Sequence, residues 1–238
     1  MRYFNTLLRK KTQISSEDQY KKTSYSQCGE DLIVKHIFEA LDIKKPSFID
    51  IGAHHPFYMN NTALFSLNGS VGINIEPDPV LFSRFPFHRV NDVNLNIGIG
   101  DKEGEEDFYI ISTPTLNTFS REIANGYENE GDYTIESIKK IKINSVQNII
   151  LEYNNGVFPD FLSLDAEGVD ELILHSIDFK KNCPVVICIE TLSFSQNGNG
   201  EKNTKIIHFL ENNGYLYYSD TNINSIFVLK SKWNKPNK

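Results

Sequence analysis

Residues 48–53 read Phe-Ile-Asp-Ile-Gly-Ala, and residues 71–76 read Val-Gly-Ile-Asn-Ile-Glu. Each stretch is a short apolar run with an acid at or near its end, which is typical of a buried strand in a parallel sheet. Pro46 and Pro77 break the chain beside the two runs,. A helix is expected between them over residues 60–67, so this part of the sequence predicts a β-α-β unit.

The rest of the chain repeats this alternation of short strands and amphipathic helices. Apolar residues at helical spacing, such as Ile33, Ile37 and Leu41, predict the helices,. The further segments that we expect are helices over residues 29–42, 144–153, 168–177 and 202–213, strands over 92–97, 107–111, 158–165 and 184–190, and a closing hairpin over 215–230. The sequence therefore predicts an α/β fold, with a parallel sheet, helices on both faces and a C-terminal antiparallel hairpin.

Length and composition indicate one globular domain. A chain of 238 residues, of which 39% are hydrophobic and 23% are charged, can bury a sizeable core without disulfides or metals,. We expect a basic N-terminal extension over residues 1–24 and a single domain over 25–238. Residues 112–143 are mixed and polar, with two expected helices, and are predicted to form a substrate-facing insertion.

Charge and cysteine content exclude several classes of protein. The net charge of −7 disfavours a general nucleic-acid binder,, and no apolar run reaches the roughly 20 residues that span a bilayer. The N-terminus has no apolar signal-peptide core, and the three scattered cysteines form no disulfide framework,. We therefore expect a cytoplasmic protein that acts on a small molecule, with a homodimer as a candidate assembly.

Four of the expected strands end in an acid, namely Asp50, Glu76, Asp165 and Glu190. Ligands bind outside the carboxyl ends of parallel strands, so these side chains are expected to converge on one rim of the sheet. Gly52 follows the first strand and lets the backbone approach a ligand closely. The carboxylate of Glu76 can accept both hydroxyls of a ribose, which indicates a cofactor that contains a nucleoside.

The sequence of the turn after the first strand distinguishes between two candidate cofactors. It reads Gly52-Ala53-His54-His55-Pro56, with one glycine and a proline that lacks an N–H group. A dinucleotide site normally uses G-x-G-x-x-G to hold a pyrophosphate, so a nicotinamide-dependent sugar oxidoreductase is the weaker alternative. S-adenosylmethionine has no phosphate and is cationic at sulfur, which suits an acidic rim.

Four stretches resemble the FkbM-type methyltransferases: Ser26-Gln27-Cys28-Gly29-Glu30-Asp31, Phe48-Ile49-Asp50-Ile51-Gly52-Ala53, Asn74-Ile75-Glu76-Pro77-Asp78 and Phe161-Leu162-Ser163-Leu164-Asp165-Ala166-Glu167-Gly168. Their order and spacing match over about residues 25–230. The resemblance implies a class I methyltransferase fold, with a Rossmann-like sheet of order 3-2-1-4-5-7-6. It also implies S-adenosylmethionine as donor and a hydroxyl acceptor, often on a sugar or polyketide. The chain departs from many relatives at residues 54–56, where they have an Asn and a further Gly.

The resemblance also implies which residues bind the donor. They are Asp50, Gly52 and Ala53 by the methionine part, Glu76 at the ribose, Asn96 by the adenine, and Gln27 and Asp31 closing over the site from the first helix. For the last two residues, helix capping and solvent contact are the alternative.

Methyl transfer to a hydroxyl needs a positioned acceptor whose proton can leave. A general base can take that proton, and the candidates are His55, His54 and Asp165. Alternatively, Asp165 and Glu190 would hold Mg²⁺ or Mn²⁺, which lowers the pKa of the hydroxyl. Without a metal, Asp165 is a base or donor contact and Glu190 binds substrate hydroxyls. The resemblance thus implies an O-methyltransferase for a bacterial saccharide or nucleotide-linked sugar.

Overall fold

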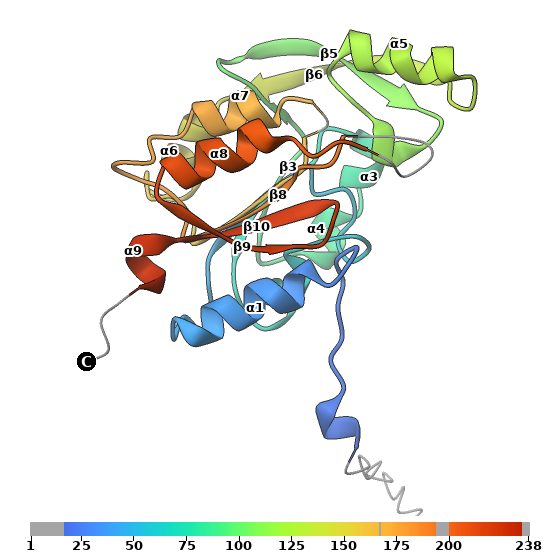
Figure 1. Ribbon diagram of the computed structural model, residues 1–238. Coiled ribbons are helices and arrows are strands. Elements are labelled where there is room, and N and C mark those ends of the chain that lie inside the picture. Colours follow the sequence, from blue (N-terminus) through green and yellow to red (C-terminus); the bar gives the residue numbers. More distant parts are fainter. Residues whose placement is uncertain (1–16, 167, 194–199, 235–238) are drawn as a thin grey trace, which may run out of the picture.

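The computed structural model describes residues 17–166, 168–193 and 200–234. Its main sheet has seven strands in the order β3-β2-β1-β7-β8-β10-β9 (Figure 1). Their bounds are β1 Phe48–Ile51, β2 Gly72–Ile75, β3 Val93–Leu95, β7 Phe161–Leu164, β8 Val186–Glu190, β9 Tyr215–Asp220 and β10 Asn224–Leu229. The five neighbouring strands β3, β2, β1, β7 and β8 pair in parallel, and β10 is antiparallel to both of its neighbours, β8 and β9. Counted within this sheet alone, the order is 3-2-1-4-5-7-6, so the predicted class I methyltransferase topology and closing hairpin are confirmed.

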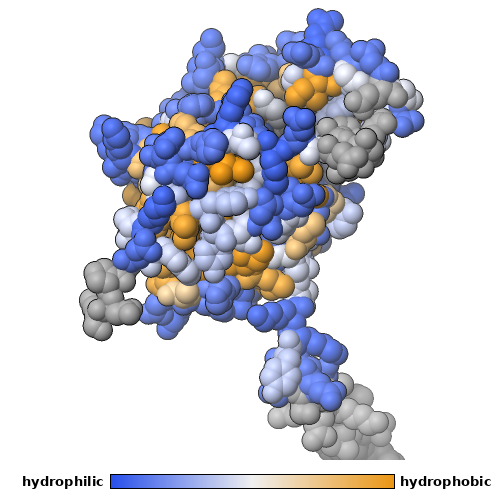
Figure 2. Space-filling view, viewed as in Figure 1, coloured by the Kyte–Doolittle hydropathy of each residue, from blue (hydrophilic) through white to orange (hydrophobic). Residues whose placement is uncertain are grey.

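Helices cover both faces of the sheet because its central strands are apolar on both sides. Every residue of β1 and β7 is buried. One face packs against α1 through Val34, Ile37 and Phe38, and the opposite face carries the helices α6, α7 and α8, as Figure 1 shows. The helix bounds are α1 Glu30–Ala40, α2 Ala63–Leu67, α3 Pro79–Phe82, α4 Phe85–His88, α6 Val146–Tyr153, α7 Asp170–His175, α8 Thr204–Asn212 and α9 Lys230–Trp233. Polar residues cover most of the molecular face in Figure 2, with apolar residues in separate patches.

A second, three-stranded sheet of order β4-β6-β5 projects beyond the main sheet (Figure 1). It comprises β4 Gly98–Ile99, β5 Gly104–Ile111 and β6 Ile135–Asn144, with the 3-10 helix η2 Pro114–Leu116 and the helix α5 Arg121–Glu130 between β5 and β6. The two helices expected within residues 112–143 are present as η2 and α5, but the strand β6 that follows them was not predicted. Ile141 and Ile143 are buried while Lys140 and Lys142 are exposed, and this two-residue period makes the segment a strand.

Gly52 fixes how the loop after β1 meets the end of β7. Its backbone has a φ of 78°, and a Cβ built there would lie 1.7 Å from the carbonyl oxygen of Asp165. The Gly52 and Ala53 N–H groups both donate to the Ile75 carbonyl at 3.0 Å. The ends of β1, β2 and β7 are thus held together by backbone contacts that leave no room for a side chain.

The structure bears on the expected N-terminal extension and on membrane-spanning helices. Most of the basic extension predicted over residues 1–24 lies outside the described residues, which begin at Glu17 and form one 3-10 turn, η1 Asp18–Tyr20. In the part of the chain that the structure describes, no helix is both long and apolar enough to cross a membrane.

We expect Gly52→Ala to destabilise the fold by more than about 3 kcal/mol, because the new methyl group meets a backbone carbonyl and the left-handed conformation disfavours alanine. Urea unfolding measures the change. Gly126→Ala is the matched control: Gly126 lies in α5 with open space at its Cβ position, so it should gain about 0.5–1 kcal/mol. Equal stability of the two variants would contradict this account of Gly52.

Candidate functional site

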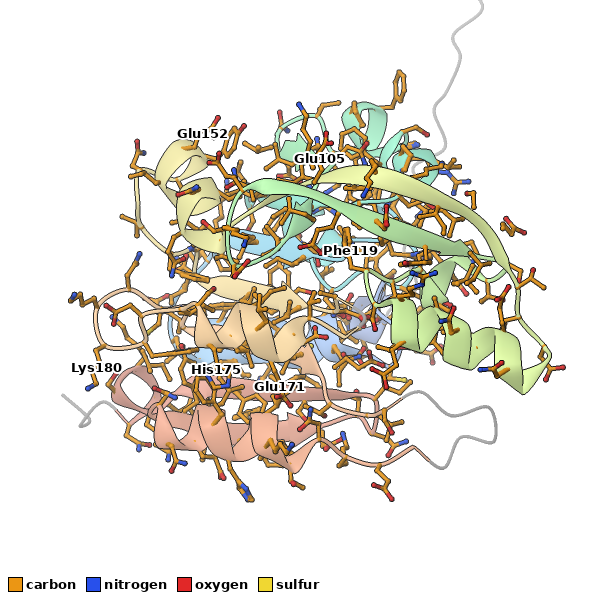
Figure 3. All side chains as sticks on the ribbon, turned by 90° about the horizontal axis from the view of Figure 1, so that it is seen from above. Glu105, Phe119, Glu152, Glu171, His175 and Lys180 are labelled. Carbon is orange, nitrogen blue, oxygen red and sulfur yellow. The ribbon has the colours of Figure 1, made fainter. Side chains whose placement is uncertain are left out.

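A cavity of about 360 Å³ opens at the carboxyl ends of the main sheet. Its lining comes from the loops after β1, β2, β7 and β8, from Gln27 in the segment before α1 and from the segment between β5 and α5. In Figure 3, seen from above, β5 and β6 run across the main sheet and Phe119 lies near the centre of the molecule. The cavity is therefore where the topology predicts a ligand, with the second sheet as its cover.

Glu76 follows β2 and lines the cavity, although only 5% of its surface is exposed. Its Oε2 accepts a hydrogen bond from the His54 backbone N–H at 2.7 Å, and its Oε1 accepts one from the Asp78 N–H at 2.7 Å. Burial raises the pKa of Glu76 to about 8, against the effect of these two hydrogen bonds. Each oxygen has a second lone pair, so the carboxylate can still accept two hydroxyls from a ligand.

Asp50 is buried beneath the loop after β1 and does not line the cavity. Its Oδ2 accepts hydrogen bonds from Asn60 Nδ2 at 2.9 Å and from Thr62 Oγ1 at 2.8 Å. The Asn60 amide also donates to the Ala53 carbonyl at 3.0 Å. Asp50 and Ala53 therefore shape the loop from inside, and the helix expected from residue 60 begins at Ala63 because these polar side chains bind the loop instead.

Arg89 holds the same loop, and sequence reasoning missed it. Arg89 is 2% exposed, and its guanidinium donates to Asp92 Oδ2 at 2.7 Å and to Thr62 Oγ1 at 3.0 Å. It also donates to the Pro56 carbonyl at 3.2 Å and to Asn60 Oδ1 at 3.3 Å. A buried charge with so many partners anchors the loop rigidly under the cavity.

The two histidines of the loop have different surroundings. His54 lines the cavity, whereas His55 does not, and its Nδ1 accepts hydrogen bonds from the backbone N–H groups of Phe57 at 3.1 Å and Tyr58 at 3.0 Å. Burial lowers the pKa of both histidines, and repulsion from neighbouring cations adds to this effect. With Nδ1 accepting, a neutral His55 carries its proton on Nε2 and cannot take another there, which argues against the predicted role of His55 as base.

Asp165 and Glu190 both line the cavity, and their carboxyl groups are hydrogen-bonded to each other. Asp165 is open to the cavity on one side, but the protein around it desolvates the carboxylate. This burial and the negative charge of Asp170 raise the pKa of Asp165 to about 7. Among the described residues, no group of three or more His, Cys, Asp or Glu side chains is arranged to hold a metal ion.

Of the other residues predicted to bind the donor, two line the cavity and two support the backbone around it. Gln27 and Gly52 line the cavity. Asn96 does not line it, and its amide donates to the Glu76 carbonyl at 2.8 Å and the Pro77 carbonyl at 2.9 Å. Asp31 is fully buried under the segment before α1. Asn96 and Asp31 thus hold backbone segments that carry the lining residues.

An apolar wall of the cavity was not predicted from the sequence. Its side chains are Leu81, Ile97, Phe108, Leu116 and Phe119. Asn117 fixes this wall to the main sheet, because its amide donates to Asp78 Oδ2 at 2.9 Å. The expected substrate-facing insertion thus contributes lining residues at its start, and a flat aromatic ligand can pack against them.

Comparison with known proteins gives a match over most of the chain. Residues 50–217 match the model described as the methyltransferase FkbM domain. A search of the curated proteins finds no match. Among solved structures, the precorrin-6y C5,15-methyltransferase from Geobacter metallireducens GS-15 is similar, with 14% sequence identity, a TM-score of 0.38, and coverage of 90% of this chain and 96% of that chain.

Replacing Arg89 should show how much the loop depends on it. We expect Arg89→Met to lower the free energy of unfolding by about 3–5 kcal/mol, because Asp92 is left buried without its cation. The exposed Arg84→Met is the control and should change stability by less than about 0.5 kcal/mol,. A loss below about 1 kcal/mol in Arg89→Met, measured by urea unfolding, would show that the ion pair contributes little.

Proposed function

This chain belongs to the FkbM methyltransferase family, and we propose that it transfers a methyl group from S-adenosylmethionine to a hydroxyl of a saccharide or nucleotide-linked sugar. The observation that carries the proposal is Glu76, a buried carboxylate at the end of β2 that lines the cavity and whose two oxygens each accept only one backbone hydrogen bond among the described residues. Such a group matches the paired hydroxyls of a ribose.

The distribution of apolar and acidic side chains in the rest of the cavity also suits the donor. The apolar wall described above suits an adenine ring, and one of its members, Leu81, belongs to the segment that follows Glu76 in the chain. The carboxyl groups of Asp165 and Glu190 are at the ends of β7 and β8 and complement a positive charge there,. When bound, S-adenosylmethionine supplies a methyl group that its sulfonium already activates.

Asp165 is the base that we propose for the acceptor hydroxyl. Its pKa of about 7 leaves a large fraction ionised at neutral pH while keeping it basic enough to accept a proton,. Glu190 lines the cavity beside Asp165 and orients the hydroxyl of the acceptor. A positioned base of this kind contributes about 10²- to 10⁴-fold to the rate, and positioning of the acceptor by the cavity supplies the remainder.

Calorimetric titration with S-adenosylhomocysteine tests the donor site. We expect micromolar binding by the wild type and at least a tenfold loss in Glu76→Gln, which replaces one accepting oxygen by an amide donor. Glu105→Gln is the control, because Glu105 is exposed on β5 (labelled in Figure 3). Binding of NADH in place of S-adenosylhomocysteine, or equal binding by the Glu76 variant, would contradict the proposal. Repeating the titration with Mg²⁺ or Mn²⁺ tests the metal alternative at Asp165 and Glu190.

The affinity for S-adenosylhomocysteine should depend on pH through Glu76. A ribose donates to the ionised carboxylate, so binding below the pKa of about 8 requires loss of a proton. Affinity should therefore rise with pH, by at most about tenfold per unit between about pH 6 and pH 8, and level off above. Glu76→Gln should abolish this rise. A flat profile in the wild type would show that the carboxylate is already ionised or does not bind the ribose.

A further inference from the structure

The segment formed by residues 24–28, which we call the strap, brings Gln27 to the cavity and is hydrogen-bonded to Asp31. This carboxylate is fully buried at the start of α1. Its Oδ1 accepts hydrogen bonds from Ser24 Oγ at 2.6 Å and Ser26 Oγ at 3.0 Å, and its Oδ2 accepts one from the Tyr25 N–H at 2.7 Å. The first half of the strap is thus held by one side chain.

Glu30 ties the second half of the strap to a distant part of the chain. It is also fully buried, and its Oε2 accepts a hydrogen bond from the Cys28 N–H at 2.8 Å. Its Oε1 accepts hydrogen bonds from Thr221 Oγ1 at 2.6 Å and Asn224 Nδ2 at 3.1 Å. Burial acts to raise the pKa of Glu30, but these hydrogen bonds outweigh it and lower the pKa. Glu30 is therefore ionised at neutral pH and joins the strap to the turn between β9 and β10.

The other side of the strap is fixed to the loop after β1. The Asn60 N–H donates to the Tyr25 carbonyl at 2.9 Å, and the rings of Tyr25 and Phe57 are 6.2 Å apart. Because Asn60 also belongs to the hydrogen-bond network of Asp50 and Arg89, the strap bridges the two loops that border the cavity. It therefore contacts the loop after β1 at one end and, through Glu30, the turn between β9 and β10 at the other.

Gln27 lies within this strap and lines the cavity, as do Ile223 on the hairpin side and Met59 on the loop side. Its side chain is exposed, and within the described part of the chain its amide has no hydrogen-bond partner. Two adjacent carboxylates are thus buried, at a cost in desolvation that their hydrogen bonds offset, while Gln27, three residues before Glu30, stays exposed at the cavity. This arrangement is typical of a support that holds one ligand-facing side chain in place.

We propose that Glu30 is a positioning residue, which holds Gln27 against the bound donor by fastening the strap to the β9–β10 turn. The inference rests on the proposed function, because it takes S-adenosylmethionine as the ligand that Gln27 meets. Gln27 acts directly and Glu30 acts only through it. The two residues should therefore behave as one unit in binding, with no separate contribution from each.

A double-mutant cycle on the binding of S-adenosylhomocysteine tests this dependence. We expect Gln27→Ala and Glu30→Gln each to weaken binding by about 3- to 10-fold, which is the value of one or two hydrogen bonds. The double variant should bind within about twofold of the weaker single variant, since removing Gln27 leaves Glu30 nothing to position. Glu39→Gln is the control, because Glu39 lies on the exposed side of the same helix and pairs with Lys35, and it should bind like the wild type.

A second variant separates positioning from folding. If Glu30→Gln lowers the folded fraction, Thr221→Val takes its place in the cycle, because it removes one hydrogen bond of Glu30 from the half-buried turn and leaves α1 unchanged. Additive losses in the double variant, or wild-type affinity in either Glu30→Gln or Gln27→Ala, would overturn the inference while the donor assignment stands. Absence of binding by the wild type would instead overturn the proposed function and this inference with it.

Discussion

The contact between Gly52 and the backbone carbonyl of Asp165 is the constraint on which the cavity depends. Parallel strands bring their carboxyl ends to one edge, but side chains normally keep the following loops apart. Without a Cβ at Gly52, the loop after β1 lies directly on the end of β7, and the same loop hydrogen-bonds to the end of β2. Glu76 and Asp165 consequently border one small cavity from the two strands, β2 and β7, that flank β1. The fold creates the site by bringing backbone segments together, and the acids then occupy positions that the strands dictate.

Polar contacts, and not apolar packing, hold the loops that border this cavity. Arg89 lies under the loop after β1, and Glu30 lies under the strap, each buried with several hydrogen-bond partners. Polar groups in a low-dielectric interior are costly to leave unpaired, so each network favours a single arrangement of its loop. A site held this way is ordered before a ligand enters, which reduces the entropy lost on binding. The apolar core supplies stability, while these networks supply the geometry.

The main sheet could be predicted because short apolar runs ending in acids mark parallel strands directly, and Glu76 at the end of such a run lies where the topology requires. The second sheet was harder to predict from the sequence, since residues 135–144 are rich in lysine and their two-residue alternation is apparent only from the paired strand. Arg89 could not be found, because its sequence neighbours give no sign that a residue so polar is fully buried. The role of His55 also depends on turn geometry, in which its ring accepts two backbone N–H groups. Sequence patterns indicate where chain segments lie, but they do not indicate which polar side chains turn inward.

The most direct test of this account is a crystal structure of the protein with bound S-adenosylhomocysteine. We expect the two ribose hydroxyls to donate to the carboxylate oxygens of Glu76, the adenine to pack against Phe108 and Phe119, and the sulfur to face Asp165. An electron density that places the ribose away from Glu76, with that carboxylate bound only to the backbone N–H groups of the loop, would contradict the account.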